Sequence, residues 1–202
     1  MTKALEDLGE YITAALSQEV VSTAVKLDEL IVVVQRNALV KVMTFLRDDS
    51  NCLFKQCMDV TAADYPEREE RFEVVYNLLS LSHNMRVRVK VMTDENTPVP
   101  SIVEVYSSVG WWERETWDMF GVYFANNPDL RRMLNDYGFE GHPLRKEFPL
   151  TGYVEVRYDE DEKRIVYEPV KLPQDFRNFD FMSPWEGMQG ILPGDEKAEG
   201  EA

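Results

Sequence analysis

The stretch that decides the fold reads R-F-E-V-V-Y-N-L-L-S-L-S-H-N-M-R-V-R-V-K-V-M and spans residues 71–92. In residues 85–92, methionine and valine alternate with arginine and lysine, as in an antiparallel strand with one buried face. Residues 71–82 form a longer run rich in residues that favour strands. Because residues 82–84 are polar, they predict the turn between the two strands.

Apolar spacing on either side of this hairpin predicts the other core elements. Residues 2–16 and 37–47 each place apolar side chains on one helical face, and Asn37 is a candidate cap for the second helix. Residues 20–26, 30–35 and 53–60 are predicted strands. The order α-β-β-α-β-β-β indicates an α+β fold in two layers, with helices over one mixed or antiparallel sheet.

The chain divides by pattern into three parts. Residues 1–110 form the α+β core domain, residues 111–150 a helical signature block with loops, and residues 151–202 an extended C-terminal hairpin and tail. We expect a helix from Ser101 to Phe120, with a break at Gly110. Residues 153–170 alternate on both sides of an acidic stretch, which predicts a β-hairpin.

Composition excludes several classes of function. The chain has 202 residues, with 22 Lys and Arg against 37 Asp and Glu, so its formal net charge is −15. Nucleic acid and anionic membrane surfaces attract basic patches, so neither is an expected partner. The longest apolar run, residues 30–34, is far shorter than the ~20 residues that span a bilayer, so no membrane insertion is expected. The N-terminal residues match neither a secretory signal nor a transit peptide.

The supply of metal ligands is small. Only Cys52, Cys57, His83 and His142 provide thiol or imidazole groups, and a tetrahedral site usually needs four such ligands. An odd offset in a strand would place the two cysteines on opposite faces, so we expect reduced core thiols in place of a metal site or a disulfide.

The first part of the signature block has the spacing of a charged helix. Glu113 and Glu115 flank an apolar stripe, while Arg114 and Asp118 lie four residues apart, within reach of an ion pair. Glu115 and Asp118 could face one cleft as an acid–base pair, but no nucleophile with a base stands near them, and catalysis is disfavoured. Composition alone is equally consistent with a solvated helix.

The second part of the block is dense in charges of both signs. Asp129, Arg131, Arg132 and Asp136 precede a glycine-punctuated loop, residues 137–143, and Arg145 follows it. Arginines beside aromatic residues favour recognition of carboxylates at an interface. His142 could relay protons, but a hydrogen-bonding role in the loop is favoured.

The tail holds four large aromatic residues, Phe176, Phe179, Phe181 and Trp185, with Pro173 and Pro184 near them. Their spacing follows neither helical nor strand periodicity. Each aromatic ring could bury ~150–250 Å², so we expect them to dock on another protein, with folding back on the domain as the alternative.

The block resembles the signature of one known family in three motifs: E-R-E-T-W-D-M-F-G at 113–121, P-D-L-R-R-M-L at 128–134 and D-Y-G-F-E-G-H-P-L-R-K-E-F-P-L at 136–150. The family is the 30-kDa subunit of respiratory complex I, the proton-pumping NADH–quinone oxidoreductase. The tail resembles its mitochondrial and alphaproteobacterial branch. One departure is Asn127, where the family usually carries a basic residue, so a charged contact at this position is in question.

The resemblance implies a subunit without catalytic residues, flavin, iron–sulfur cluster or metal; FMN and the clusters belong to partner subunits. It implies a place in the peripheral arm on the cytoplasmic face of a bacterial inner membrane. The implied partners are the large quinone-site subunit and the small subunit that carries the terminal iron–sulfur cluster. The alternative is the equivalent subunit of a membrane-bound hydrogenase or a ferredoxin–plastoquinone oxidoreductase.

The resemblance also implies a set of residues that hold the block together and contact partners. They are Glu113, Arg114, Glu115, Asp118, Arg131, Arg132, Asp136, Tyr137, His142 and Arg145 in the signature block, and Phe176, Arg177, Phe179 and Trp185 in the tail.

Overall fold

The computed structural model describes residues 2–173, which belong to two compact units that divide after Gly152. The first unit contains the core helices and strands together with the signature block, and the second contains a hairpin. Among the described residues, no helix is both long enough and apolar enough to pass through a bilayer.

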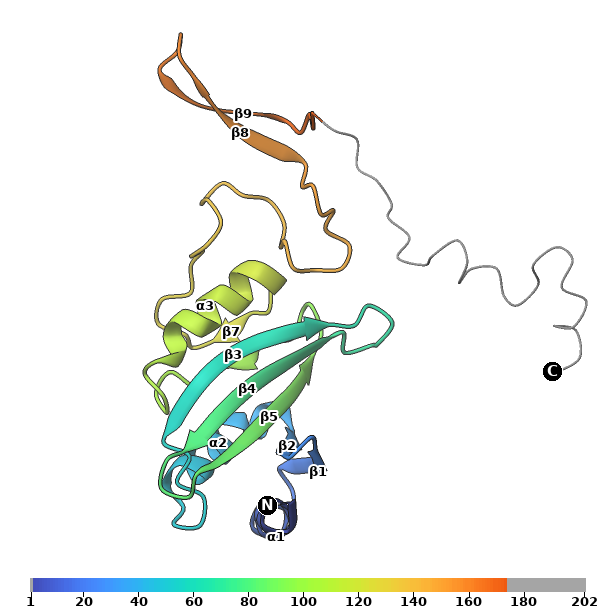
Figure 1. The fold of residues 1–202 in the computed structure, drawn as a ribbon, viewed down its shortest axis with the longest axis vertical. Helices are drawn as coiled ribbons and strands as arrows, with labels where there is room; N and C mark the ends of the chain where they lie inside the picture. The colour runs from blue at the N-terminus through green and yellow to red at the C-terminus, as the bar shows by residue number, and fades with distance from the viewer. Residues whose placement is uncertain (1, 174–202) are drawn as a thin grey trace, which may run out of the picture. The chain divides into compact units, whose positions relative to one another are not determined.

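A five-stranded sheet forms the first layer of the first unit (Figure 1). Its strands are β1 (Val20–Lys26), β2 (Glu29–Val34), β3 (Gln56–Asp64), β4 (Phe72–Ser80) and β5 (Met85–Thr93). They lie in the order β1-β2-β5-β4-β3, with β2 and β5 parallel and the other neighbours antiparallel. The predicted mixed sheet and its β4–β5 hairpin are therefore confirmed.

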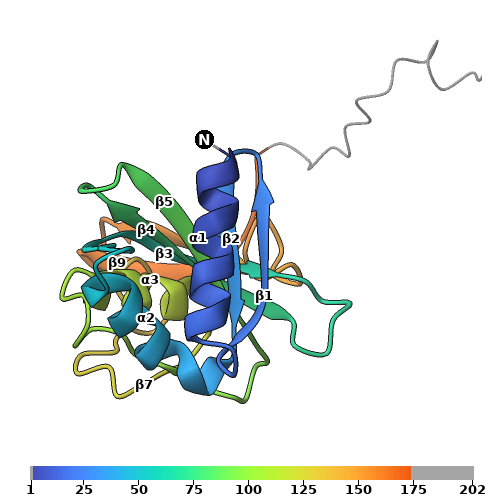
Figure 2. The ribbon, with the colours of Figure 1, turned by 90° about the horizontal axis from the view of Figure 1, so that it is seen from below.

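Two helices cover one face of this sheet, as expected. α1 (Thr2–Ala15) packs on β1 and β2, and Figure 2 shows it running along them. The short 3₁₀ turn η1 (Arg36–Ala38) leads into α2 (Leu39–Asp48). The buried faces of both helices join the inward residues of the strands in one hydrophobic core. Val74, Tyr76, Val89 and Val91 are 0% exposed, so the alternation read from residues 71–92 does define the buried face.

Two predicted boundaries are wrong for local reasons. Asn37 lies inside the 3₁₀ turn and does not cap α2, whose N-cap is Ala38 without a side-chain hydrogen bond. β3 begins at Gln56, not at Leu53, because Leu53 has a φ of 47° and its amide donates to the Asp49 carbonyl oxygen in a turn.

The helix expected from Ser101 to Phe120 is also wrong in its first half. α3 (Val109–Phe120) begins eight residues later, and turns occupy the intervening stretch. Before it, β6 (Val99–Pro100) pairs in parallel with β7 (Phe124–Ala125), which follows α3. α3 itself packs on β3.

The second unit contains the predicted hairpin, which is confirmed. β8 (Val154–Asp159) and β9 (Arg164–Pro169) are antiparallel and pair without a register shift.

Candidate functional site

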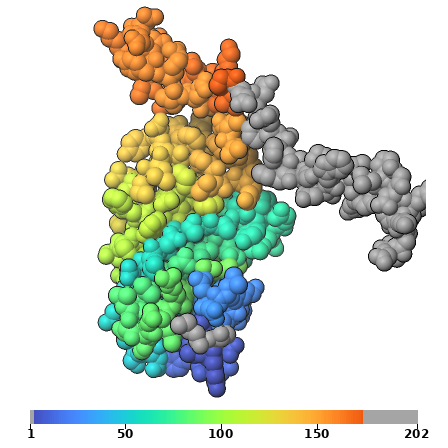
Figure 3. Space-filling view, viewed as in Figure 1, coloured from blue at the N-terminus to red at the C-terminus, as the bar shows by residue number. Residues whose placement is uncertain are grey.

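Three charged side chains of α3 are buried. Glu113 and Asp118 are 0% exposed and Arg114 is 7% exposed. The solvated-helix alternative is therefore wrong for these residues. The reason is that β3 covers one side of α3 while loop residues 127–145 bind to its other side and its C-terminal end. Figure 3 shows these loop residues, in yellow, as a continuous layer of atoms at the surface.

Glu113 fastens α3 to the segments that precede and follow it in the chain. Its Oε1 accepts the Ile102 amide at 2.9 Å, and its Oε2 accepts the Ser101 hydroxyl and the Asn127 side-chain amide, both at 2.7 Å. Because the three donors are neutral, burial raises the pKa of Glu113 even though these hydrogen bonds oppose the shift. Asn127 thus reaches this carboxylate through a neutral amide.

Asp118 organises the loop that follows α3. Its Oδ2 accepts the backbone amides of Met133, Leu134 and Asn135 at 2.8 to 3.0 Å. Its Oδ1 accepts the Asn135 side-chain amide at 3.0 Å and the Arg132 guanidinium at 2.7 Å. Burial alone would raise the pKa of Asp118, but these donors lower it well below its usual range, so the carboxylate is ionised at neutral pH.

The expected ion pair between Arg114 and Asp118 is not formed, and that prediction is wrong. Arg114 donates to the carbonyl oxygens of Arg131 and Arg132, each at 3.1 Å, and lies 3.7 Å from the Asp129 carboxylate. The loop offers Arg114 a carboxylate and two backbone carbonyl oxygens. It offers Asp118 a guanidinium and backbone amides. Each buried charge is therefore better satisfied by the loop than by its neighbour on the helix.

The end of α3 is capped by the H-P-L-R stretch of the signature block. Gly121, with a φ of 80°, closes the helix by donating its amide to the Trp117 carbonyl oxygen. The carbonyl oxygens of the next three residues, 118–120, also accept hydrogen bonds. In chain order the donors are His142 Nδ1 at 3.0 Å, the Leu144 amide at 3.0 Å and Arg145 Nε at 2.6 Å. This contact fixes the proton of His142 on Nδ1, and burial lowers the pKa of the ring, in keeping with the favoured hydrogen-bonding role.

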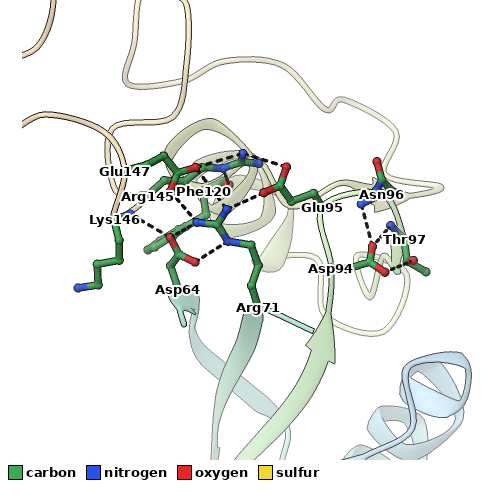
Figure 4. Close-up of polar contacts among 10 residues, drawn as sticks. All are labelled: Asp64, Arg71, Asp94, Glu95, Asn96, Thr97, Phe120, Arg145, Lys146 and Glu147. Carbon is green, nitrogen blue, oxygen red and sulfur yellow. Dashed lines mark hydrogen bonds and ion pairs between the residues drawn. The ribbon is translucent and has the colours of Figure 1, made fainter. Parts of the chain in front are cut away.

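A second polar cluster lies where the sheet meets the signature block, and we call it the Arg71 clasp (Figure 4). The Arg71 guanidinium donates to both oxygens of Asp64 at 2.6 and 2.8 Å. It also donates to Glu95 at 2.5 Å and to Glu147 at 2.6 Å. One arginine therefore joins the ends of β3 and β4 to the segment after β5 and to the loop at 145–147.

The loop contributes its own contacts to the clasp. The Lys146 amide donates to Asp64 Oδ2 at 2.9 Å, and Arg145 lies 3.6 Å from Glu95. Burial raises the pKa of Asp64, but the Arg71 and Lys146 donors outweigh it and lower the pKa below its ordinary value. The hydrogen bonds that Arg71 donates to the carboxylates of Asp64, Glu147 and Glu95 raise the pKa of Arg71. Asp64 and Arg71 are thus both charged at neutral pH.

Sequence reasoning missed Asp64, Arg71, Glu95 and Glu147. One of these residues, Asp64, could have been found from the sequence. Side chains alternate between the two faces of a strand, so Asp64 lies on the same inward face as Val60. A carboxylate on a buried face needs a cationic partner, and Arg71 stands at the start of the next strand. The approach of Glu147 from 76 residues away had no such signal.

The remaining predicted residues are more exposed. Arg131 donates to Asp129 at 2.8 Å and to the Tyr137 hydroxyl at 3.4 Å, and Tyr137 is 81% exposed. Glu115 is half-buried on α3. Asp136 is exposed at the start of a turn, and its backbone carbonyl oxygen accepts the Phe139 amide. The tail residues Phe176, Arg177, Phe179 and Trp185 lie outside the described residues.

Both cysteines are free and buried in the same core, which corrects the expectation of opposite strand faces. Cys52 precedes β3 in a turn, so the strand geometry does not apply to it. Burial raises the pKa of each thiol to about 12. Within residues 2–173, no three Asp, Glu, His or Cys side chains converge in a group that could hold a metal ion. The expected absence of a cofactor stays a prediction.

Comparison with known proteins identifies the family. The sequence model described as "Respiratory-chain NADH dehydrogenase, 30 Kd subunit" matches residues 32–154. The chain belongs to this 30-kDa subunit family. An NADH-quinone oxidoreductase subunit from Paramagnetospirillum magneticum is 66% identical over 199 residues, which are 98% of this chain and 100% of the relative. Its namesake from Rhodospirillum rubrum is 61% identical, over 99% of this chain and 96% of its own.

A solved structure extends the comparison to a more distant protein. A chain from the structure of the membrane-bound sulfane sulfur reductase, an archaeal respiratory membrane complex, superposes with a TM-score of 0.63 at 24% identity. The match covers 80% of this chain and 98% of that one. At this identity the likeness shows a shared fold.

Proposed function

We propose that the chain is a structural subunit in the peripheral arm of proton-pumping NADH–quinone oxidoreductase. It carries no catalytic residues and no cofactor, and it positions the large quinone-site subunit and the small subunit with the terminal iron–sulfur cluster. The complex passes electrons from NADH through FMN and iron–sulfur clusters in partner subunits to quinone, on the cytoplasmic face of the bacterial inner membrane.

The structural role in this proposal is supported by the way the buried charges of α3 are hydrogen-bonded. Glu113 and Asp118 accept three and five hydrogen bonds respectively, and each bond joins the helix to another segment of the chain. Carboxylates held in this way rigidify a fold and are poorly placed to exchange protons with a substrate. The match to subunits named for NADH–quinone oxidoreductase, over nearly their whole length, supplies the identity of the complex.

Affinity purification tests the proposal. The tagged full chain, expressed from its own locus, should recover flavin- and NADH-binding subunits together with the quinone-site subunit. Recovery of hydrogenase-type subunits without a flavin subunit would support the alternative assignment. Recovery of the chain alone would contradict both assignments.

The tail provides a second test. Deletion of residues 172–185, which include Phe176, Phe179 and Trp185, should abolish recovery of the large subunit. A truncated chain that still assembles fully would show that these residues do not anchor it.

A further inference from the structure

The β8–β9 hairpin has two faces of different chemistry. In an antiparallel pair, residues opposite each other share a face, and so does every second residue along a strand. One face, which we call the hairpin apolar face, carries the opposed pairs Val154–Pro169, Val156–Tyr167 and Tyr158–Ile165.

The hairpin apolar face is exposed along its whole length. Val154, Val156 and Tyr158 are 54, 55 and 57% exposed, and Ile165 and Tyr167 are 59 and 62% exposed. A contiguous apolar patch on a surface marks a site of interaction. A two-stranded hairpin is also marginally stable by itself, so this face gains from being covered.

The opposite face already suits water. Arg157 lies 3.3 Å from both carboxylate oxygens of Glu168 and 3.2 Å from Asp159, and Arg164 pairs with Glu162. These are exposed ion pairs between neighbours on the hairpin itself. The charged face is therefore suited to solvent, whereas the apolar face is suited to a protein contact.

Charge and area select the kind of partner. The hairpin tip reads D-E-D-E at residues 159–162, and the whole chain carries −15, so a second copy would bring like charges together. A surface bordered by lysine or arginine would be attracted instead. The five side chains offer roughly 500 Å², less than the ~800 Å² that each partner buries in a standard interface. The face is therefore one part of a larger contact between different chains.

We propose that the hairpin apolar face docks on another subunit of the complex, at a surface that is apolar in its centre and bordered by basic side chains. This assignment rests on the function proposed above, because it requires that the chain assembles with other complex I subunits.

Two matched valines test the face. Val156 lies on the apolar face, and Val166 lies on the charged face opposite Arg157. In the tagged full chain, Val156→Glu should lower the recovery of partner subunits at least about fivefold, since it buries a charge in the contact. Val166→Glu changes strand propensity in the same way, but it places the new carboxylate beside Arg157 on the charged face. Recovery of partner subunits should therefore stay at the wild-type level.

The outcomes separate the two proposals. Equal recovery with both variants, whether high or low, would overturn the docking face. Failure of the unmodified chain to recover complex I subunits would instead overturn the proposed function.

A photoreactive phenylalanine derivative at position 165 identifies the occupant in the assembled complex, with position 168 as the control. We expect a cross-link from position 165 to another subunit, close to lysine or arginine residues. A cross-link to a second copy of this chain, or within the chain itself, would overturn the assignment.

Discussion

At the scale of single residues, Asp118 shows how one buried carboxylate can fold a loop. Three consecutive amides, one side-chain amide and one guanidinium all donate to its two oxygens. Hydrogen bonds to a charged acceptor are roughly twice as strong as neutral ones. The conformation of residues 132–135 therefore depends on this one side chain.

Asp118→Asn should lower the free energy of unfolding by about 2–4 kcal/mol. The substitution removes the negative charge, and it replaces one accepting oxygen with an NH2 group that faces other hydrogen-bond donors. Asp7→Asn is the matched control, since Asp7 is an exposed residue of α1 and its substitution should cost less than about 1 kcal/mol. Urea denaturation of both variants measures the difference. Equal losses would contradict the role given to Asp118.

Glu113 should make the stability of the fold depend on pH in the opposite sense to Asp118. Its pKa is raised in the folded state above the ordinary value of 4.5, so its stabilising contribution is complete below that pH and is lost as pH rises through the folded pKa. Glu113→Gln does not titrate. Its stability relative to wild type should therefore increase between pH 4.5 and pH 8, as measured by urea denaturation at both values. Glu115→Gln controls for loss of a charge on α3, and an equal trend there would refute the assignment.

At the scale of elements, α3 depends on the C-cap provided by residues 142–145. A Cβ at Gly121 would lie 2.5 Å from Arg145 Nη2 and 2.7 Å from the His142 ring, in backbone of positive φ. Gly121→Ala should therefore cost about 2 kcal/mol or more. Gly110→Ala, in the first turn of the same helix, meets only the two Val103 methyls at 3.7 and 4.0 Å and should stabilise by up to about 1 kcal/mol. Thermal unfolding distinguishes the two, and shifts of the same sign would contradict the cap.

The Arg71 clasp holds the signature loop to the end of the sheet. Arg71→Ala would leave the Asp64 side chain, which is 0% exposed, without its bidentate partner, at a cost of about 3–5 kcal/mol. Arg68→Ala is the control from the same β3–β4 connection, where the side chain is 48% exposed and the expected cost is below about 1 kcal/mol. Hydrogen exchange should also show faster opening of residues 144–148 in Arg71→Ala alone. Unchanged exchange there would show that the clasp does not hold the loop.

The elements that could be predicted from sequence are those whose contacts are local. Period-two alternation predicted β5, and helical spacing predicted α1 and α2. The stretch at 101–108 could not be predicted as turns, because the Ile102 amide is held by Glu113 from eleven residues away. For the same reason the motif residues of α3 were found, but not their partners, since Asp118 is bound by residues up to seventeen positions further along.

At the scale of the whole molecule, the net charge of −15 takes on a more specific meaning. The most buried charges of the signature block are paired or hydrogen-bonded within the first unit, whereas the acidic tip of the hairpin lies on an exposed element of the second. Charge in the first unit thus serves folding. In the second unit acidic residues outnumber basic ones, and this excess can steer a basic partner.

Truncation after Gly152 should separate these two uses of charge. Because residues 1–152 form a compact unit with the whole hydrophobic core, the truncated chain should unfold cooperatively, with a stability within about 1 kcal/mol of the full chain. Its recovery of complex I subunits should fall at least about tenfold, because the hairpin and tail that make the proposed contacts are gone. Circular dichroism during urea denaturation measures the first quantity, and quantitative mass spectrometry of the purified assembly measures the second. A truncated chain that fails to fold would show that the core needs the second unit, and one that assembles normally would place the partner contacts on the first.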